Sequence, residues 1–254
     1  MAGWVASGNG VAGAGSCVRP SRRWQRSGQL HPVADGALLE ALQAFRALSL
    51  HPEPRMQADD ATFIAASARL TLAFAALDRI EAAGERALIF LEKLDMQPRL
   101  AGIIQRRYHM ASTPEIINGQ VPGARRQARV DRFQTAPEGF DAMLLFPRAA
   151  GVGLTITRAN HVIHLDRWWN PAVEDQCTGR ALRIGQTRTV HIHVPIATLP
   201  AGPASFDENL HALLERKRTY DDIVLARAKA WKSLTDDPER IRSIGVRSWA
   251  SVNG

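Results

Sequence analysis

The sequence predicts an α/β fold, in which a parallel β-sheet has helices on both faces and further helices flank it. Two observations support this prediction. Short, continuously apolar segments alternate with longer segments of helical periodicity from Arg86 onward, as in a sheet that is buried on both faces. With 254 residues the chain is long enough for one sizeable core, and it has no uncharged apolar run of about 18 residues that would predict a membrane span.

The predicted elements are assigned by periodicity and by Gly and Pro at their ends. The predicted strands cover residues 87–91, 115–117, 143–146, 161–166 and 189–196. The predicted helices cover residues 35–48, 61–83, 96–108, 125–133, 171–185 and 205–230. In the first two helices the spacing predicts these inward-facing residues: Leu38, Leu39, Leu42, Phe45, Leu48, Phe63, Ile64, Leu70, Phe74, Leu77 and Ile80.

Local signals mark the ends of two helices. Asn170 suits an N-cap, Pro171 suits the first helical position, and Gly185 is a plausible stop. Ser205 and Glu208 have the spacing of a capping box at the start of the last helix.

Composition shifts divide the chain into five segments. Residues 1–34 are rich in Gly, Ser and Arg without periodicity, which predicts a disordered N-terminal extension. Residues 35–84 are a helical segment, residues 85–204 the α/β domain, residues 205–230 a packing helix and residues 231–254 a tail without an assigned role.

The charge balance favours an anionic partner. The net charge is +7 and the isoelectric point is about 10.2, which suits nucleic acid. The two cysteines, Cys17 and Cys177, are too far apart in sequence to build a disulfide framework or a cysteine-rich zinc site. The N-terminus lacks the features of a signal peptide, so a reducing compartment, the bacterial cytoplasm or nucleoid, is expected.

The segment from Leu144 to Gln186 contains the densest signals for function. It is predicted to form a strand, a glycine loop, a second strand and a helix on which Gln176, Arg180 and Arg183 share one face. Two guanidinium groups and an amide on one face suit a polyanionic ligand, because arginine binds phosphate oxygens in pairs and stays charged. The alternative is a solvated basic face near a helix C-terminus, where arginine is favourable in any case.

The sequence pattern of this segment resembles that of a known family. Residues 176–186 read Q-x-x-G-R-A-x-R-I-G-Q, which resembles the sixth motif of the Swi/Snf-like helicase-related ATPases of helicase superfamily two. Residues 148–155 resemble the fifth motif, and residues 166–171 resemble the segment that joins the two. The resemblance implies the second RecA-like lobe of a two-lobe motor in which ATP lies between the lobes.

The resemblance also implies roles for residues of the sixth motif. Arg183 is the expected arginine finger, and Arg180 is expected to be a second contact to the terminal phosphate. Gln176 is expected to link to the other lobe or to the nucleotide. The physical role of an arginine finger is to offset the charge that develops on the phosphoryl oxygens.

For the fifth motif, the resemblance implies coupling between nucleotide and DNA. Gly151 and Gly153, together with Thr155, are expected to couple the nucleotide state to the DNA track. Arg148 is expected to contact a phosphate of the double-stranded DNA backbone; the alternative is an exposed loop arginine without a role. Backbone recognition of this kind is insensitive to sequence and is weakened by salt.

Two parts of a complete ATPase are not found in this sequence. A phosphate loop needs Gly-Lys-Ser/Thr, and the one Lys-Ser pair, at Lys232, follows Trp231 instead of glycine. Residues 207–210 begin like an acidic box, but they open a predicted helix and are interpreted as capping. ATP and Mg²⁺ are therefore expected to bind only through a first lobe, missing or separately encoded, and the chain is not expected to hydrolyse ATP alone.

Other functional readings remain open. The second hypothesis is a truncated, non-enzymatic module that binds DNA or a partner, or a gene remnant; a small-molecule enzyme has little support. His191 and His193 share a strand face, but no third ligand is visible nearby, so no metal site is predicted. The arginines of the 125–133 helix are interpreted as a solvated face.

Overall fold

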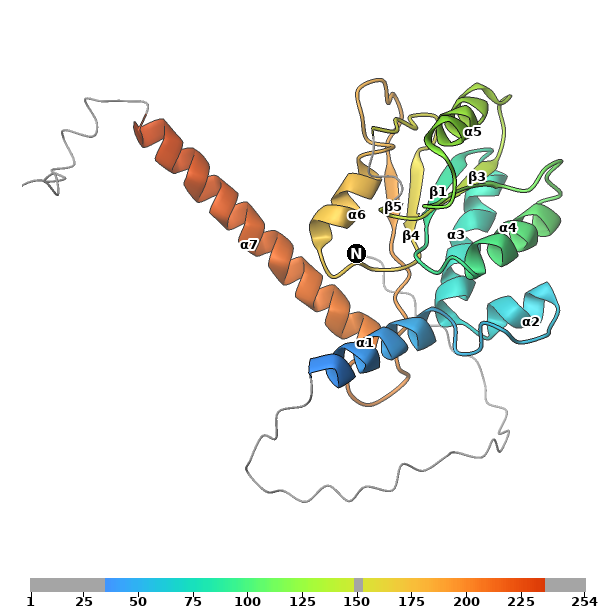
Figure 1. Cartoon of the computed structure of the whole chain (residues 1–254), viewed down its shortest axis with the longest axis horizontal. Coiled ribbons are helices and arrows are strands. Elements are labelled where there is room, and N and C mark those ends of the chain that lie inside the picture. Colours follow the sequence, from blue (N-terminus) through green and yellow to red (C-terminus); the bar gives the residue numbers. More distant parts are fainter. Residues whose placement is uncertain (1–34, 149–152, 236–254) are drawn as a thin grey trace, which may run out of the picture.

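The structure, a computed structural model, describes residues 35–148 and 153–235 (Figure 1). Five parallel strands form one sheet in the order β2-β3-β1-β4-β5. The strands are β1 (Arg86–Phe90), β2 (Glu115–Ile117), β3 (Asp141–Leu145), β4 (His161–His164) and β5 (His191–His193). The predicted parallel α/β sheet is thus confirmed. The predicted extension 1–34 and most of the predicted tail lie outside the described residues.

Seven helices are present in the described part of the chain. They are α1 (Asp35–Leu50), α2 (Asp60–Ala65), α3 (Ala68–Ala82), α4 (Met96–Arg107), α5 (Gly123–Thr135), α6 (Pro171–Thr178) and α7 (Phe206–Thr235). None of these helices has an apolar stretch of the length needed to cross a membrane. The capping box is confirmed, since Ser205 N donates to Glu208 Oε2 (2.7 Å) and Glu208 N donates to Ser205 Oγ (3.1 Å).

The predicted 61–83 helix is wrong in one respect, because it is two helices with a break at Ser67. Ser67 Oγ accepts a hydrogen bond from Leu70 N (3.2 Å) and donates to the carbonyl of Leu50 (2.7 Å). Serine at a helix start satisfies a free amide that an unbroken helix would not offer. Apolar residues of both helices pack in one core cluster, among them Phe63 of α2 and Phe74 of α3.

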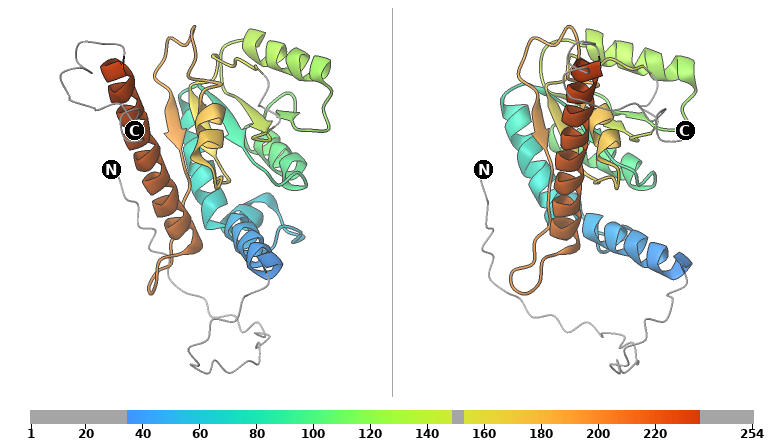
Figure 2. Two further views of the ribbon diagram at one scale, coloured as in Figure 1. Left: turned by 60° about the vertical axis from the view of Figure 1, so that its left-hand side comes forward. Right: turned by 90° about the vertical axis from the view of Figure 1, so that its left-hand side faces the viewer.

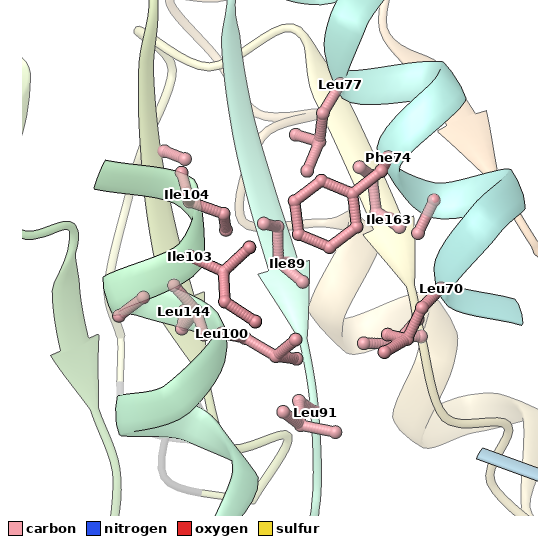
Figure 3. Packing of buried hydrophobic residues seen from close by; sticks show 14 of the residues in the cluster. Leu70, Phe74, Leu77, Ile89, Leu91, Leu100, Ile103, Ile104, Leu144 and Ile163 are labelled. Atoms are coloured by element: carbon pink, nitrogen blue, oxygen red, sulfur yellow. The ribbon is translucent and has the colours of Figure 1, made fainter. Parts of the chain in front are cut away.

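Helices cover both faces of the sheet (Figure 2). On one face α3 and α4 pack on alternate residues of the strands; Figure 3 shows Phe74, Leu100 and Ile104 around Ile89 of β1. On the other face α5 and α6 pack on the remaining strand residues, among them Leu88. The six inward-facing residues predicted between residues 61 and 83 are all buried. Continuous burial of β1 explains why its sequence is apolar without alternation.

Helix α1 lies outside these layers, beside the start of α7 (Figures 1 and 2). The prediction that its apolar residues face inward is wrong for Leu39, Phe45 and Leu48, whose side chains are 54%, 56% and 54% exposed. The spacing is helical, but the sheet face that these residues would cover is already occupied by α3 and α4. Phe45 stacks beside Phe206 of α7, with 6.2 Å between the two ring centroids.

A buried ion pair joins α3 to α7. Arg69 is fully buried, and its Nε donates to Asp207 Oδ2 (2.6 Å) while its Nη1 donates to the carbonyl of Leu165 (3.1 Å). Burial by itself raises the pKa of Asp207, but the hydrogen bonds and charge of Arg69 outweigh it and hold that pKa below its usual value. The capping interpretation therefore holds for Glu208, whereas Asp207 is a structural ion-pair partner.

Acid is expected to destabilise the fold through His164. This side chain is buried beside Phe90, its Nε2 lies 2.9 Å from Thr178 Oγ1, and burial lowers its pKa to about 4. The unfolded chain binds the proton near pH 6.5, so stability present above that pH is lost as pH falls toward 4, by about 1.4 kcal/mol per pH unit. Urea unfolding of the original protein and of His164→Leu at several pH values measures this. If the free energy of unfolding changes equally with pH in the two proteins, His164 is not the cause of the acid destabilisation.

Candidate functional site

The candidate site is formed by residues 153–159 and by the turns that follow α6. Their backbones meet where the amide of Ile156 donates to the carbonyl of Arg180 (2.8 Å). Gly153 opens the first segment with φ of +63°, a left-handed conformation that glycine adopts without strain. The fifth- and sixth-motif segments, about 25 residues apart in sequence, are therefore adjacent in the fold.

Two guanidinium groups converge on one backbone carbonyl in this site. Arg180 Nη1 lies 3.4 Å from the carbonyl oxygen of Leu154, and Arg183 Nη1 lies 3.3 Å from the same oxygen. Arg183 Nη1 is also 3.3 Å from Thr155 Oγ1. Arg183 and Thr155 are exposed, whereas Arg180 is only 7% exposed. The structure thus brings together three of the predicted site residues.

The predicted helical face of this site is wrong. Helix α6 ends at Thr178, with Gly179 as its C-cap, and Arg180 and Arg183 lie in the turns beyond it. Glycine has a low helix propensity, and the backbone after it bonds to residues 153–159 in place of a continued helix. Gln176 is exposed on α6 itself, so it shares no helix face with the two arginines.

The guanidinium of Arg180 is incompletely satisfied. Its Nε is buried and has no hydrogen-bond partner among the residues that the structure describes. Burial is the main reason that the pKa of Arg180 is lowered from its ordinary value, and the positive charge of Arg183 adds to the effect. A buried cation next to a second cation favours an anion, since an anion would offset both effects.

Gln186, which sequence analysis did not single out, holds the arginine-bearing turns in place. Its Nε2 donates to the carbonyls of Thr157 (2.9 Å), Ala159 (2.9 Å) and Ala181 (3.2 Å). Its Oε1 accepts a bond from Arg188 N (3.0 Å). The signal available in the sequence was its place as the last residue of the sixth-motif pattern.

Arg148 lies apart from this pair of arginines. It is exposed, and its guanidinium stacks over the Trp168 ring, 5.3 Å from the ring centroid. Gly151, another predicted site residue, lies outside the described part of the chain.

The histidines of β4 and β5 form a cluster that the sequence did not predict. His161 Nδ1 lies 3.0 Å from His193 Nε2, and the His161 and His191 rings stack at 4.9 Å. Glu85 bonds to the other nitrogen of His161 (2.5 Å). No group of His, Cys, Asp and Glu among the described residues has an arrangement that could hold a metal ion.

The comparisons with known proteins place this fold and these motifs. Residues 72–185 match the model of the helicase conserved C-terminal domain. The α/β domain is therefore a helicase C-terminal domain. A solved structure described as a Sulfolobus solfataricus SWI2/SNF2 ATPase C-terminal domain aligns with a TM-score of 0.55 and 26% identity, covering 74% of this chain and 72% of that one. In sequence and fold the chain is similar to the C-terminal, RecA-like lobe of SWI2/SNF2 ATPases.

Two curated relatives extend this result. The putative ATP-dependent helicase/translocase YwqA of Bacillus subtilis is 32% identical over 189 residues, which are 74% of this chain and 20% of that protein. The Zorya protein ZorD of Escherichia coli is 40% identical over 139 residues, which are 53% of this chain and 12% of that protein. The chain thus spans a fifth or less of the length of these relatives.

Proposed function

We propose that this chain acts as the C-terminal lobe of an ATP-dependent double-stranded DNA translocase and supplies the arginines of its ATPase site. The convergence of Arg180 and Arg183 on the Leu154 carbonyl supports the proposal most directly. It puts two cations beside the fifth-motif segment, at the surface where Arg183 is exposed.

The chemistry proposed for this lobe is electrostatic. Arg183 is exposed and makes two side-chain bonds of 3.3 Å within the described residues, so it can turn toward a phosphoryl group and offset its developing charge. Arg180 is buried and fixed, so it contributes a second charge from a constant position. Gln176 is proposed to contact the nucleotide or the first lobe, and Gly151, Gly153 and Thr155 to transmit its state. ATP and Mg²⁺ would be held mainly by a first lobe, where the family has its phosphate loop.

The direct test joins this chain to the N-terminal ATPase lobe of a Swi2/Snf2-like relative such as YwqA. The fusion is expected to hydrolyse ATP faster when duplex DNA is added, because each lobe supplies half of the site. The first lobe alone is the control and is expected to show little hydrolysis. A folded fusion that is no faster than the first lobe alone would contradict the proposal.

Arg148 is expected to contact the DNA backbone. Arg148→Ala should weaken duplex binding about equally for all sequences and reduce the slope of log affinity against log salt by about 0.9, the value for one phosphate contact. Fluorescence anisotropy across a salt series measures both quantities. Arg125→Ala, which removes an exposed arginine of α5, is the matched control and should leave the slope unchanged. An unchanged slope for Arg148→Ala would mean that Arg148 is an exposed loop arginine without a role in DNA binding.

The second candidate function is a non-enzymatic module that binds DNA or a partner protein. The observation that favours it is the exposure of three large apolar side chains of α1, Leu39, Phe45 and Leu48, which suits contact with another protein. The fusion distinguishes the two candidates: DNA binding by a folded protein without any gain in hydrolysis supports the module.

A further inference from the structure

A cleft of about 380 Å³ lies at the carboxyl ends of β1 and β4, where α1 crosses that edge of the sheet (Figure 1). It is separate from the Arg180–Arg183 pair. Its lining includes Gln43 and Arg46 of α1, Lys93 after β1, and Trp168 and Trp169 after β4. The carboxyl edge of a parallel sheet is the usual place for ligands in such folds.

Arg46, which lines the cleft, has one edge of its guanidinium without a partner among the described residues. Nη1 pairs with Glu92, whereas Nε and Nη2 are buried and lack a partner among the described residues. Elsewhere the protein uses this Nε–Nη2 edge to bind a carboxylate with two bonds, as in Arg107 with Asp78 (2.8 and 2.8 Å). Arg46 is therefore shaped for a two-oxygen anion that it does not have.

Trp168 adds a third donor in the same wall. Its indole Nε1 is buried without a partner in the described residues, and the centroid of its ring lies 5.5 Å from the guanidinium carbon of Arg46 and 5.3 Å from that of Arg148. Five buried side-chain polar atoms lack partners in the described part of the chain, and three of them belong to this wall. Such atoms are costly unless an acceptor reaches them, so their grouping points to a ligand.

Two carboxylates, those of Glu92 and Asp166, also line the cleft, and both already have partners. Asp166 Oδ2 accepts the Glu92 amide (2.9 Å), Asp166 Oδ1 lies 3.6 Å from Arg69, and the Glu92 carboxylate pairs with Arg46. Lys93 lines the cleft and is exposed, and Arg148 stacks on the Trp168 ring. The unpaired donors of Arg46 and Trp168 suit a phosphate better than a carboxylate, because phosphate has more acceptor oxygens.

We propose that this cleft binds a phosphate group of a phosphate ester through Arg46, with Trp168 and Lys93 as further donors. The Nε–Nη2 edge is shielded from water, so the Arg46 side chain turns into the cleft when the phosphate enters. The flat Trp168 and Trp169 rings would pack against the remainder of the ester. The inference rests on the proposed function only in naming DNA as one source of the phosphate.

The test follows the indole N–H resonances of the full chain, labelled with ¹⁵N, during titration with inorganic phosphate or with a short duplex of arbitrary sequence. The Trp168 resonance, assigned from its absence in Trp168→Phe, is expected to move and saturate. Arg46→Gln should weaken the response about tenfold or more, as expected for loss of a charged two-bond contact. Arg125→Gln is the control and should titrate like the original protein.

Each result decides the matter. Movement with both ligands supports a site for free phosphate as well, and movement with the duplex alone supports DNA as the source. A Trp168 resonance that moves with neither ligand overturns the inference. Duplex binding that depends on Arg148 but not on Arg46 overturns it while leaving the proposed function intact. If Arg46→Gln fails to fold, the loss of duplex affinity in Trp168→Phe decides in its place, since that variant keeps an aromatic ring but lacks the indole N–H donor.

Discussion

Replacing Arg69 with methionine is expected to lower the free energy of unfolding by about 3–5 kcal/mol, the largest effect on stability of any change considered. Methionine keeps most of the side-chain volume, but it leaves the Asp207 carboxylate buried without its cation. The carbonyl of Leu165 loses a donor as well. Urea denaturation at pH 7 measures the change, provided that the m-value stays constant.

The matched control is Arg106→Met. Arg106 pairs with Asp60 by two bonds (2.7 and 2.8 Å), but the side chains are 62% and 39% exposed. Water solvates the remaining carboxylate, so the expected cost is at most about 1 kcal/mol. A loss of less than about 1 kcal/mol for Arg69→Met would mean that Asp207 finds other partners and that the pair does not hold α3 and α7 together.

Replacing Arg183 with alanine, in the fusion with a first lobe, is expected to lower kcat for ATP hydrolysis by about 10³-fold. The KM for ATP should change much less, because an arginine finger acts on charge that develops in the transition state. Since Arg183 is exposed and makes only two long hydrogen bonds, its removal should leave the fold stable. Steady-state hydrolysis with saturating DNA gives both constants.

Two variants control this result. Arg125→Ala removes an exposed arginine from α5 and should retain the full rate. Arg183→Lys keeps the charge but not the planar fork, and it should recover only part of the rate. An unchanged kcat in Arg183→Ala would show that the finger is assigned to the wrong residue.

The sequence predicted the sheet well because its signal is local. Strands β1 and β3 are continuously apolar and bounded by polar residues or proline, and this pattern needs no knowledge of distant contacts. The motif residues Thr155 and Arg183 were found through their order and spacing, and the fold brings them within 3.3 Å.

Features set by contacts distant in sequence were missed. Helix α6 was predicted to continue to Gly185, but it ends where the backbone of Arg180 bonds to Ile156, 24 residues earlier. The Arg69–Asp207 pair joins residues 138 positions apart, and no periodicity marks either partner. Helix α1 was predicted by spacing alone, which cannot tell whether any surface remains for its apolar residues to cover.

The central claim, that this lobe completes an ATPase site through its arginines, is tested most directly by the hydrolysis rate of the fusion with and without duplex DNA. We predict DNA-stimulated hydrolysis for the fusion that has the original sequence, and hydrolysis no faster than that of the first lobe alone for the Arg180→Ala, Arg183→Ala double variant. Equal, DNA-stimulated rates in both fusions would contradict the account.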